Sequence, residues 1–195
     1  MFDIGAALDR QIADHMTNRP VVLLVEAEDP RVIEAAFQLP RFARPVFLAD
    51  RDRVQEIIAR DLPHIEPARV DFLLSESAFC SLETGPCERL RDELTQAVLD
   101  LPADRRIAET EAEARRFVAT PAGFGIMAVH QGHADMVVGG AQHEPRDYFR
   151  PMIKVMAVSP VLCEAGIIVL PDSHPEGIYP HNIVVIGDVG VNATM

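Results

Sequence analysis

Tryptophan is absent from this chain of 195 residues, and aromatic side chains make up only 6% of it. Proteins that hold single-stranded nucleic acid stack its bases on aromatic rings. Proteins that bind nucleic acid without sequence preference also need a basic face. The formal net charge of −12 is of the wrong sign for such a face. The composition therefore predicts no nucleic-acid partner.

Long apolar runs are also missing. No run reaches the roughly 18 residues that a membrane-spanning helix needs. The first residues, MFDIGAALDR, lack the basic start and apolar centre of a signal peptide. The overall content of 48% hydrophobic and 25% charged residues is typical of a globular protein. We therefore expect a soluble, cytoplasmic protein with no membrane contact.

Cysteine is scarce, and no pair has the CxxC spacing. Cys80, Cys87 and Cys163 are an odd number, which is typical of free thiols in a reducing compartment. The short motifs GxGxxG, GxxxxGK[ST], HExxH and GxSxG are absent as well. Their absence removes the strongest local signals for dinucleotide, nucleoside triphosphate, metalloprotease and hydrolase sites.

One stretch offers metal-ligating side chains. In HQGHAD, His130 and His133 have a spacing that could share a helix face, and Asp135 follows. However, Gly132 is predicted to end the helix between the histidines, and no third ligand has motif spacing. We predict no metal and no covalently bound cofactor.

Apolar runs alternate with segments of helical periodicity along most of the chain. Strands are predicted over residues 20–27, 43–50, 69–76 and 134–140, and helices over 4–16, 29–39, 51–62, 87–100, 109–120, 121–132 and 146–158. Strands alternating with helices of about ten residues indicate parallel βαβ units. The predicted fold class is α/β, with a doubly wound, mostly parallel sheet.

The pattern changes after residue 158. Residues 160–171 and 183–191 are predicted to be two strands, joined by a loop that is polar and rich in proline. We expect an antiparallel pair that starts a second module, which divides the chain into a domain over 1–157 and a partial module over 158–195. An apolar strand this close to the end of the sequence would be an exposed edge. It predicts either dimerisation there or a longer architecture.

The stretch VVGGAQHEPRDYFRP, Val137 to Pro151, ends a predicted strand on two glycines and continues with arginines. Ligands of open α/β sheets bind at the carboxyl ends of strands. A helix starting near Asp147 would direct N–H groups at an anion, and Arg146 and Arg150 could each grip a phosphate. Equally, the glycines could only turn the chain and the arginines pair with neighbouring acids. Spacing alone leaves both interpretations open.

Acidic residues follow the two later strands. Asp172, His174 and Asp188 are possible strand-end catalytic groups. Acids in such places more often form turns, and we favour that interpretation.

Taken together, FGIMAVHQGHADMVVGGAQHEPRDYFRP, VLPD and IGDVGVNAT resemble the phosphate acetyl/butyryl-transferase family. That family has the pattern FGxMMVxxGxADGxVSGAxHTTxDxLRPxLQ, and the match runs from Phe124 to Pro151 without gaps. The resemblance implies the isocitrate-dehydrogenase-like α/β fold of phosphotransacetylases, usually as a homodimer. It implies transfer of an acyl group between coenzyme A and phosphate, with coenzyme A as a substrate. Arg150 matches the arginine of the family's LRP.

The resemblance places Gly139, Gly140, His143 and Arg146 beside Arg150 at a phosphate or acyl-phosphate site. This chain departs from the family at three positions in this stretch: Gly139 replaces a serine, and Glu144 and Pro145 replace two threonines. The family's Ser-Arg and Asp catalytic group also has no match here, because the likeness covers about the first half of the enzyme. Two interpretations follow: an acyltransferase, or a non-catalytic domain that senses acyl-CoA or acyl phosphate.

Overall fold

The computed structural model describes residues 18–82, 87–156, 165–170 and 183–187. The described residues between 18 and 156 form one compact unit, and the later strands belong to a second. The predicted helix over 4–16 lies outside the described residues.

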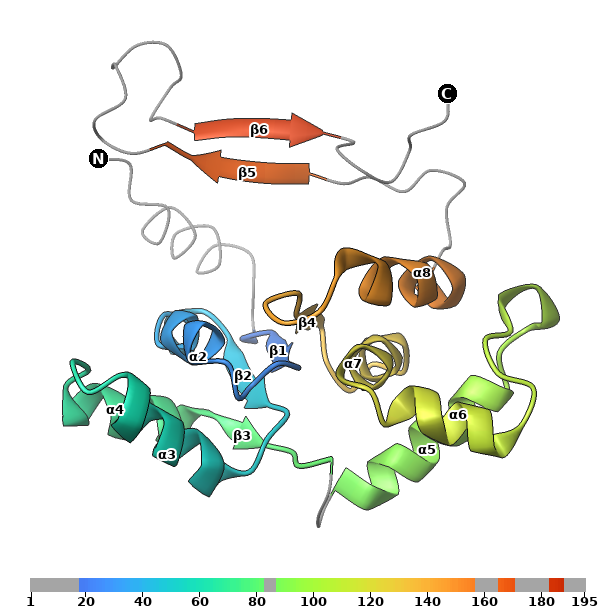
Figure 1. The fold of residues 1–195 in the computed structure, drawn as a ribbon, viewed down its shortest axis with the longest axis horizontal. Helices are drawn as coiled ribbons and strands as arrows, with labels where there is room; N and C mark the ends of the chain where they lie inside the picture. Colours follow the sequence, from blue (N-terminus) through green and yellow to red (C-terminus); the bar gives the residue numbers. More distant parts are fainter. Residues whose placement is uncertain (1–17, 83–86, 157–164, 171–182, 188–195) are drawn as a thin grey trace. The chain divides into compact units, whose positions relative to one another are not determined.

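A sheet of four parallel strands lies at the centre of the first unit (Figure 1). Its strands are β1 (Val21–Leu24), β2 (Arg44–Phe47), β3 (Ala78–Phe79) and β4 (Met136–Val138), in the order β3-β2-β1-β4. The helices between them are α2 (Pro30–Ala36), α3 (Arg51–Asp61), α4 (Pro67–Glu76), α5 (Cys87–Leu99), α6 (Glu111–Val118) and α7 (Pro121–His130). Helix α8 (Pro145–Met156) follows β4. The predicted α/β class with a mostly parallel sheet is confirmed.

Both faces of the sheet are buried, and β1 shows why. Successive side chains of a strand point to opposite faces. Val22 and Leu24 pack with the apolar sides of α2, α3 and α4, whereas Leu23 and Val25 pack with those of α5, α6, α7 and α8. The continuous apolar run of β1 thus fits a strand covered on both sides. Figure 1 shows the two groups of helices on either side of the strands.

The strand predicted over residues 69–76 is wrong, because this segment is helix α4. Val70, Leu73 and Leu74 have the i, i+3, i+4 spacing of one helix face. Leu73 and Leu74 are buried, while Phe72 is exposed. Pro67 occupies the first helical turn, where the missing N–H costs nothing. The third strand is instead the short β3 that follows the helix.

Helix ends coincide with the predicted capping residues. The Asp29 side chain accepts a hydrogen bond from the Arg31 N–H at the start of α2. Thr110 and Glu113 form the predicted capping box of α6. Gly132 follows the end of α7 with a φ of +78°, a conformation that glycine adopts without steric cost.

Cys80 and Cys87 form a disulfide, with their Cα atoms 5.7 Å apart. The expectation of free thiols is therefore wrong for these two residues. The end of β3 and the start of α5 come together, which the sequence spacing alone does not reveal. Cys163 lies outside the described residues.

The second unit contains an antiparallel pair, β5 (Ala165–Val169) and β6 (Ile183–Gly187). Ala165 pairs with Gly187 and Val169 with Ile183, so the predicted antiparallel pair is confirmed. Among the helices that the structure describes, none has both the length and the apolarity to cross a membrane.

Candidate functional site

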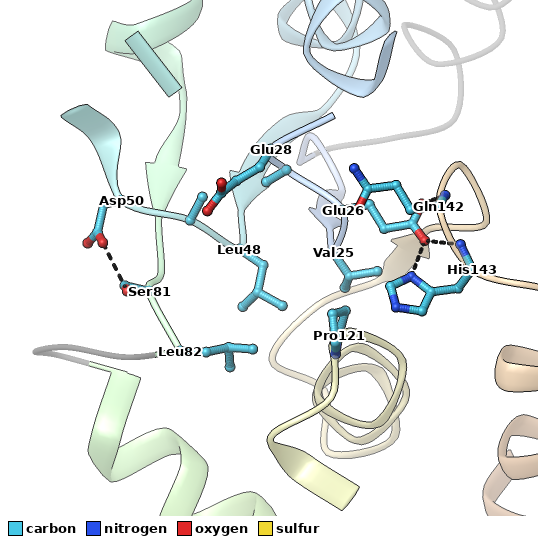
Figure 2. A pocket seen from close by; sticks show the side chains of 12 residues that line it. Val25, Glu26, Glu28, Leu48, Asp50, Ser81, Leu82, Pro121, Gln142 and His143 are labelled. Carbon is cyan, nitrogen blue, oxygen red and sulfur yellow. Dashed lines mark hydrogen bonds and ion pairs between the residues drawn. The ribbon is translucent and has the colours of Figure 1, made fainter. Parts of the chain in front are cut away.

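The candidate site lies where the parallel strands end. Strand β1 lies between β2 and β4. The chain leads from β1 to β2 and β3 on one side, and then crosses to β4 on the other side. Such a switch point opens a crevice at the carboxyl ends of the strands. A cavity of about 430 Å³ lies there, lined by residues that follow β1, β2, β3 and β4 and by Pro121. Figure 2 shows these side chains around it.

Glu26 organises this crevice. It follows β1, and its side chain is 1% exposed. Its carboxylate accepts hydrogen bonds from three successive backbone N–H groups after β4: those of Ala141, Gln142 at 3.1 Å and His143 at 3.1 Å. Successive N–H groups of this kind form a concave anion site. Here the chain's own carboxylate occupies it.

Two side chains complete the shell around the carboxylate. His143 Nδ1 lies 2.7 Å from Glu26 Oε1, and the Tyr148 hydroxyl donates to the same oxygen at 3.1 Å. Burial raises the pKa of Glu26, but its hydrogen bonds, led by that from His143, outweigh burial and bring the pKa below 4.5. Burial, and then the Glu26 charge, raise the pKa of Tyr148. Glu26 is thus ionised near neutral pH and Tyr148 remains a donor.

A second carboxylate ties the same loop to α2. Asp29 Oδ2 lies 2.7 Å from Arg31 Nη2, and Arg31 also donates to the Ala141 carbonyl at 2.6 Å. Gln142 Nε2 approaches Asp29 Oδ2 at 3.4 Å. The hydrogen bond from the Arg31 side chain is the main reason why the pKa of Asp29 falls from 3.8 to about 2.

The lowered pKa of Asp29 makes the stability of the fold depend on pH. A carboxyl whose pKa is lower in the folded state stabilises the protein above its unfolded pKa, and this contribution disappears as the pH falls through the folded pKa. An asparagine in place of Asp29 would keep the helix cap but not the charge. We expect Asp29→Asn to lower the free energy of unfolding by about 1 kcal/mol at pH 5 to 7, because solvent screens the exposed Arg31. The difference should vanish near pH 2.

Urea unfolding followed by circular dichroism between pH 7 and pH 2 measures this effect. Asp61→Asn is the control for an ion pair on the surface, because the Arg60 side chain also lowers the pKa of Asp61; its effect on stability should have the same sign and be smaller. An Asp29→Asn effect that stays constant over the whole pH range would contradict the assignment.

A second cavity, of about 580 Å³, lies beside the first and shares His143 and Pro121 with it. One part of its lining is cationic: Arg146, Arg150 and Lys154 from α8. Another part is apolar: Ile107, Phe117, Ala122 and Pro151. A cavity of this composition suits a ligand that has an anionic group and a small apolar group.

The three cations differ in their partners. Arg146 Nε lies 2.8 Å from Glu144 Oε2, and Lys154 Nζ donates to the Arg106 carbonyl at 2.9 Å. Arg150 makes no ion pair or hydrogen bond with any residue that the structure describes. The pairing with neighbouring acids that spacing left open thus holds for Arg146.

The two glycines differ as well. Gly140 has a φ of +99°, so the turn after β4 favours glycine. At Gly139, a Cβ atom would lie 2.4 Å from the Tyr148 hydroxyl oxygen and 2.5 Å from Cζ. The Tyr148 ring thus lies where the family's serine would project. The predicted strand-end acids Asp172 and Asp188 lie outside the described residues, as does His174.

Helix α8 begins at Pro145, one residue before the predicted helix over 146–158. Pro151 lies inside the helix. Asp147 Oδ2 accepts a hydrogen bond from the Glu144 N–H at 3.3 Å, so this carboxylate lies at the helix N-terminus.

The side chains of His133 and Asp135, near the end of α7, bind different partners and do not form a common site. His133 Nε2 lies 2.9 Å from Glu93 Oε1, and the Asp135 carboxylate accepts the Val21 N–H at 2.8 Å. Over the described ranges, no group of three or more His, Cys, Asp or Glu side chains could hold a metal ion. Asp135 serves instead to fix the start of β1 beside the start of β4.

Sequence reasoning missed the residues that order the loop after β4: Glu26, Arg31 and Tyr148, together with the contact of Asp29 to that loop. One signal was present, because Glu26 directly interrupts the apolar run VVLLVEA. A carboxylate so close to a strand buried on both faces needs hydrogen-bond partners. Its partners lie well over a hundred residues further along the chain, so local spacing could not reveal them.

Comparison with known proteins agrees with this geometry. The family model described as Phosphate acetyl/butaryl transferase matches residues 8–194. The chain belongs to this family. A phosphate acetyltransferase of Staphylococcus aureus is 28% identical over 155 residues, which are 76% of this chain and 42% of that protein.

Two solved structures have the same fold. The EutD phosphotransacetylase from Staphylococcus aureus has a TM-score of 0.70 at 23% identity, over 100% of this chain and 53% of that one. A phosphotransacetylase from Streptococcus pyogenes has a TM-score of 0.66 at 18% identity, over 88% and 49%. This family member therefore spans about half the length of the relatives it matches.

Proposed function

We propose that this chain takes part in acyl transfer between coenzyme A and phosphate, converting acyl-CoA and phosphate to acyl phosphate and coenzyme A. Family membership supports this function. The observation that carries it is the second cavity, whose lining combines apolar side chains with Arg150, a cation that has no partner among the described residues. In a chain of net charge −12, an anionic ligand needs such a placed cation, because the overall field repels it.

Each part of the second cavity has a role in this reaction. Arg150 holds the phosphate by paired N–H donors and stabilises charge on the oxygen that leaves the acyl carbon. Phe117 and Ala122 accommodate the acyl group. Arg146 contributes less, because Glu144 already neutralises it. The turn at Gly139 and Gly140 brings His143 to the same cavity. Coenzyme A enters as a substrate, and the reaction uses no metal.

Arg150→Ala is the decisive variant for this function. We expect it to weaken the binding of inorganic phosphate at least about tenfold, since charged hydrogen bonds of this kind contribute about 1.5–3 kcal/mol. Isothermal titration measures binding, and thioester formation from acetyl phosphate and coenzyme A measures turnover. Arg146→Ala is the matched control on the same helix and should have a smaller effect. Equal phosphate affinity in Arg150→Ala and the unaltered chain would refute the assignment.

The same assay separates the two interpretations of the sequence. Thioester formation supports the acyltransferase. Binding of phosphate and acyl-CoA without any thioester would favour a regulatory domain that senses these ligands. The cytoplasmic location, the homodimer and the boundary between residues 157 and 158 stay predictions. Light scattering of the purified chain measures its oligomeric state.

A further inference from the structure

His143 is held more firmly than the other histidines that pair with a carboxylate among the described residues. Its ring and its backbone N–H both bind Glu26 Oε1, at 2.7 and 3.1 Å. The Glu26 side chain is 1% exposed. The partners of the other two histidines, Glu93 and Glu34, are 59% and 53% exposed. A buried carboxylate with several donors cannot swing away, so the His143 ring has a fixed orientation.

The partner also fixes the tautomer of His143. A carboxylate only accepts hydrogen bonds, so Nδ1 carries the proton that lies between it and Glu26. Nε2 is then an acceptor in the neutral ring. It makes no hydrogen bond to any described residue. Figure 2 shows the ring bonded to Glu26 on one side.

The His143 side chain is 42% exposed and lines both cavities. It therefore shares a cavity with Arg150, the residue that binds phosphate in the proposed function. A buried carboxylate that orients an imidazole, whose other nitrogen faces a substrate cavity, is the arrangement that enzymes use to remove a proton from a nucleophile.

We propose that His143, positioned by Glu26, is the general base of acyl transfer in this chain. Nε2 takes the proton of the coenzyme A thiol as the sulfur bonds to the acyl carbon of the acyl phosphate. The bond between that carbon and the phosphate oxygen then breaks. Nε2 passes its proton to the departing phosphate, so the ring ends neutral and no other reactant is needed. His143 is a catalytic residue, and Glu26 is a positioning residue. This inference rests on the proposed function.

Several charged groups surround the two cavities that His143 lines. Glu26 and Glu28 follow β1, Asp50 follows β2, and helix α8 contributes Arg146, Asp147, Arg150 and Lys154. The Glu26 carboxylate is the one in direct contact with the ring among the described residues.

His143→Asn tests the catalytic role. The amide of the new side chain can still donate to Glu26, but it cannot take up a proton. For acetyl phosphate and coenzyme A, we expect kcat to fall at least about 100-fold. The affinity for inorganic phosphate should change by no more than about twofold. The urea midpoint should not change beyond the experimental error. Free imidazole should restore part of the activity of His143→Ala, which a purely structural role would not allow.

Glu26→Gln tests the positioning role by separating kcat from KM. Loss of the carboxylate should lower kcat at least about tenfold and leave KM within about twofold, because the imidazole is still present but is no longer held in one orientation. His133→Asn and Glu93→Gln are matched controls from an exposed pair, and they should leave kcat and KM unchanged.

The outcomes separate this inference from the proposed function. If the unaltered chain turns over and depends on Arg150, but His143→Asn retains full kcat, the general base is refuted and acyl transfer stands. If the unaltered chain neither binds phosphate nor forms thioester, both are refuted.

Discussion

Gly123→Ala should lower the free energy of unfolding by about 3 kcal/mol. A Cβ atom at this position in α7 would lie 2.0 Å from the carbonyl oxygen of Phe117 and 2.9 Å from Thr120 Oγ1. That carbonyl accepts the Thr120 hydroxyl at 2.7 Å, and Thr120 caps Gly123 N–H at 3.0 Å. Relief of the clash would therefore disrupt the junction between α6 and α7, and overpacking against backbone is costly.

Helix propensity alone predicts that Gly123→Ala stabilises the protein, because alanine is more favourable than glycine in a helix by up to about 1 kcal/mol. Urea unfolding followed by circular dichroism distinguishes the two. Gly125→Ala is the graded control: its Cβ would meet the side-chain methyl groups of Val137 at 2.5 Å and Val25 at 2.7 Å. Side chains can shift, so we expect a loss of about 1–2 kcal/mol. A Gly123→Ala variant as stable as the unaltered chain would show that the junction is not packed as described.

Gly139→Ser, which restores the family's residue, should cost about 2 kcal/mol in this chain. Tyr148 occupies the space that the serine needs. To make room, the ring must leave and give up its hydrogen bond to the charged Glu26, a type of bond that contributes about 1.5–3 kcal/mol. The substitution should therefore be harmful only while an aromatic ring occupies position 148.

A double-mutant cycle checks this dependence. In a Tyr148→Ala background, Gly139→Ser should be almost neutral. In a Tyr148→Phe background it should remain costly, because the ring atoms Cζ and Cε1 would still lie 2.5 and 2.7 Å from the new Cβ. Additive costs for Gly139→Ser and Tyr148→Ala would contradict the coupling. The glycine of this chain and its tyrosine are, on this view, a matched pair.

The layers of the fold could be predicted because their signals are local. The runs around Leu23 and Val46 are long enough for strands and short enough to exclude helices. Capping residues such as Asp29 and Thr110 lie next to the helices they begin. The segment of α4 was misread because its apolar residues are almost continuous, and only Pro67 and the exposed Phe72 distinguish a helix from a strand.

The candidate site could be predicted only in part. The glycines and arginines after β4 form a compact sequence signal, and it led to the second cavity. Glu26, which orders the loop, is visible from the sequence only as a charge after an apolar run. Its partner His143 lies 117 residues away. No pattern of local spacing encodes a contact of that range. Whether Arg146 or Arg150 is paired within the chain also depends on packing.

The distance in sequence between Glu26 and the loop after β4 has a consequence for folding. Bringing together two points separated by 117 residues costs conformational entropy on the order of 4 kcal/mol. The hydrogen bonds to Glu26 can form only after β1 has paired with β4, so this corner is assembled late rather than from a local nucleus. A ligand that requires this corner binds only the completed fold, and it stabilises that fold by an amount that grows with the ratio of ligand concentration to Kd.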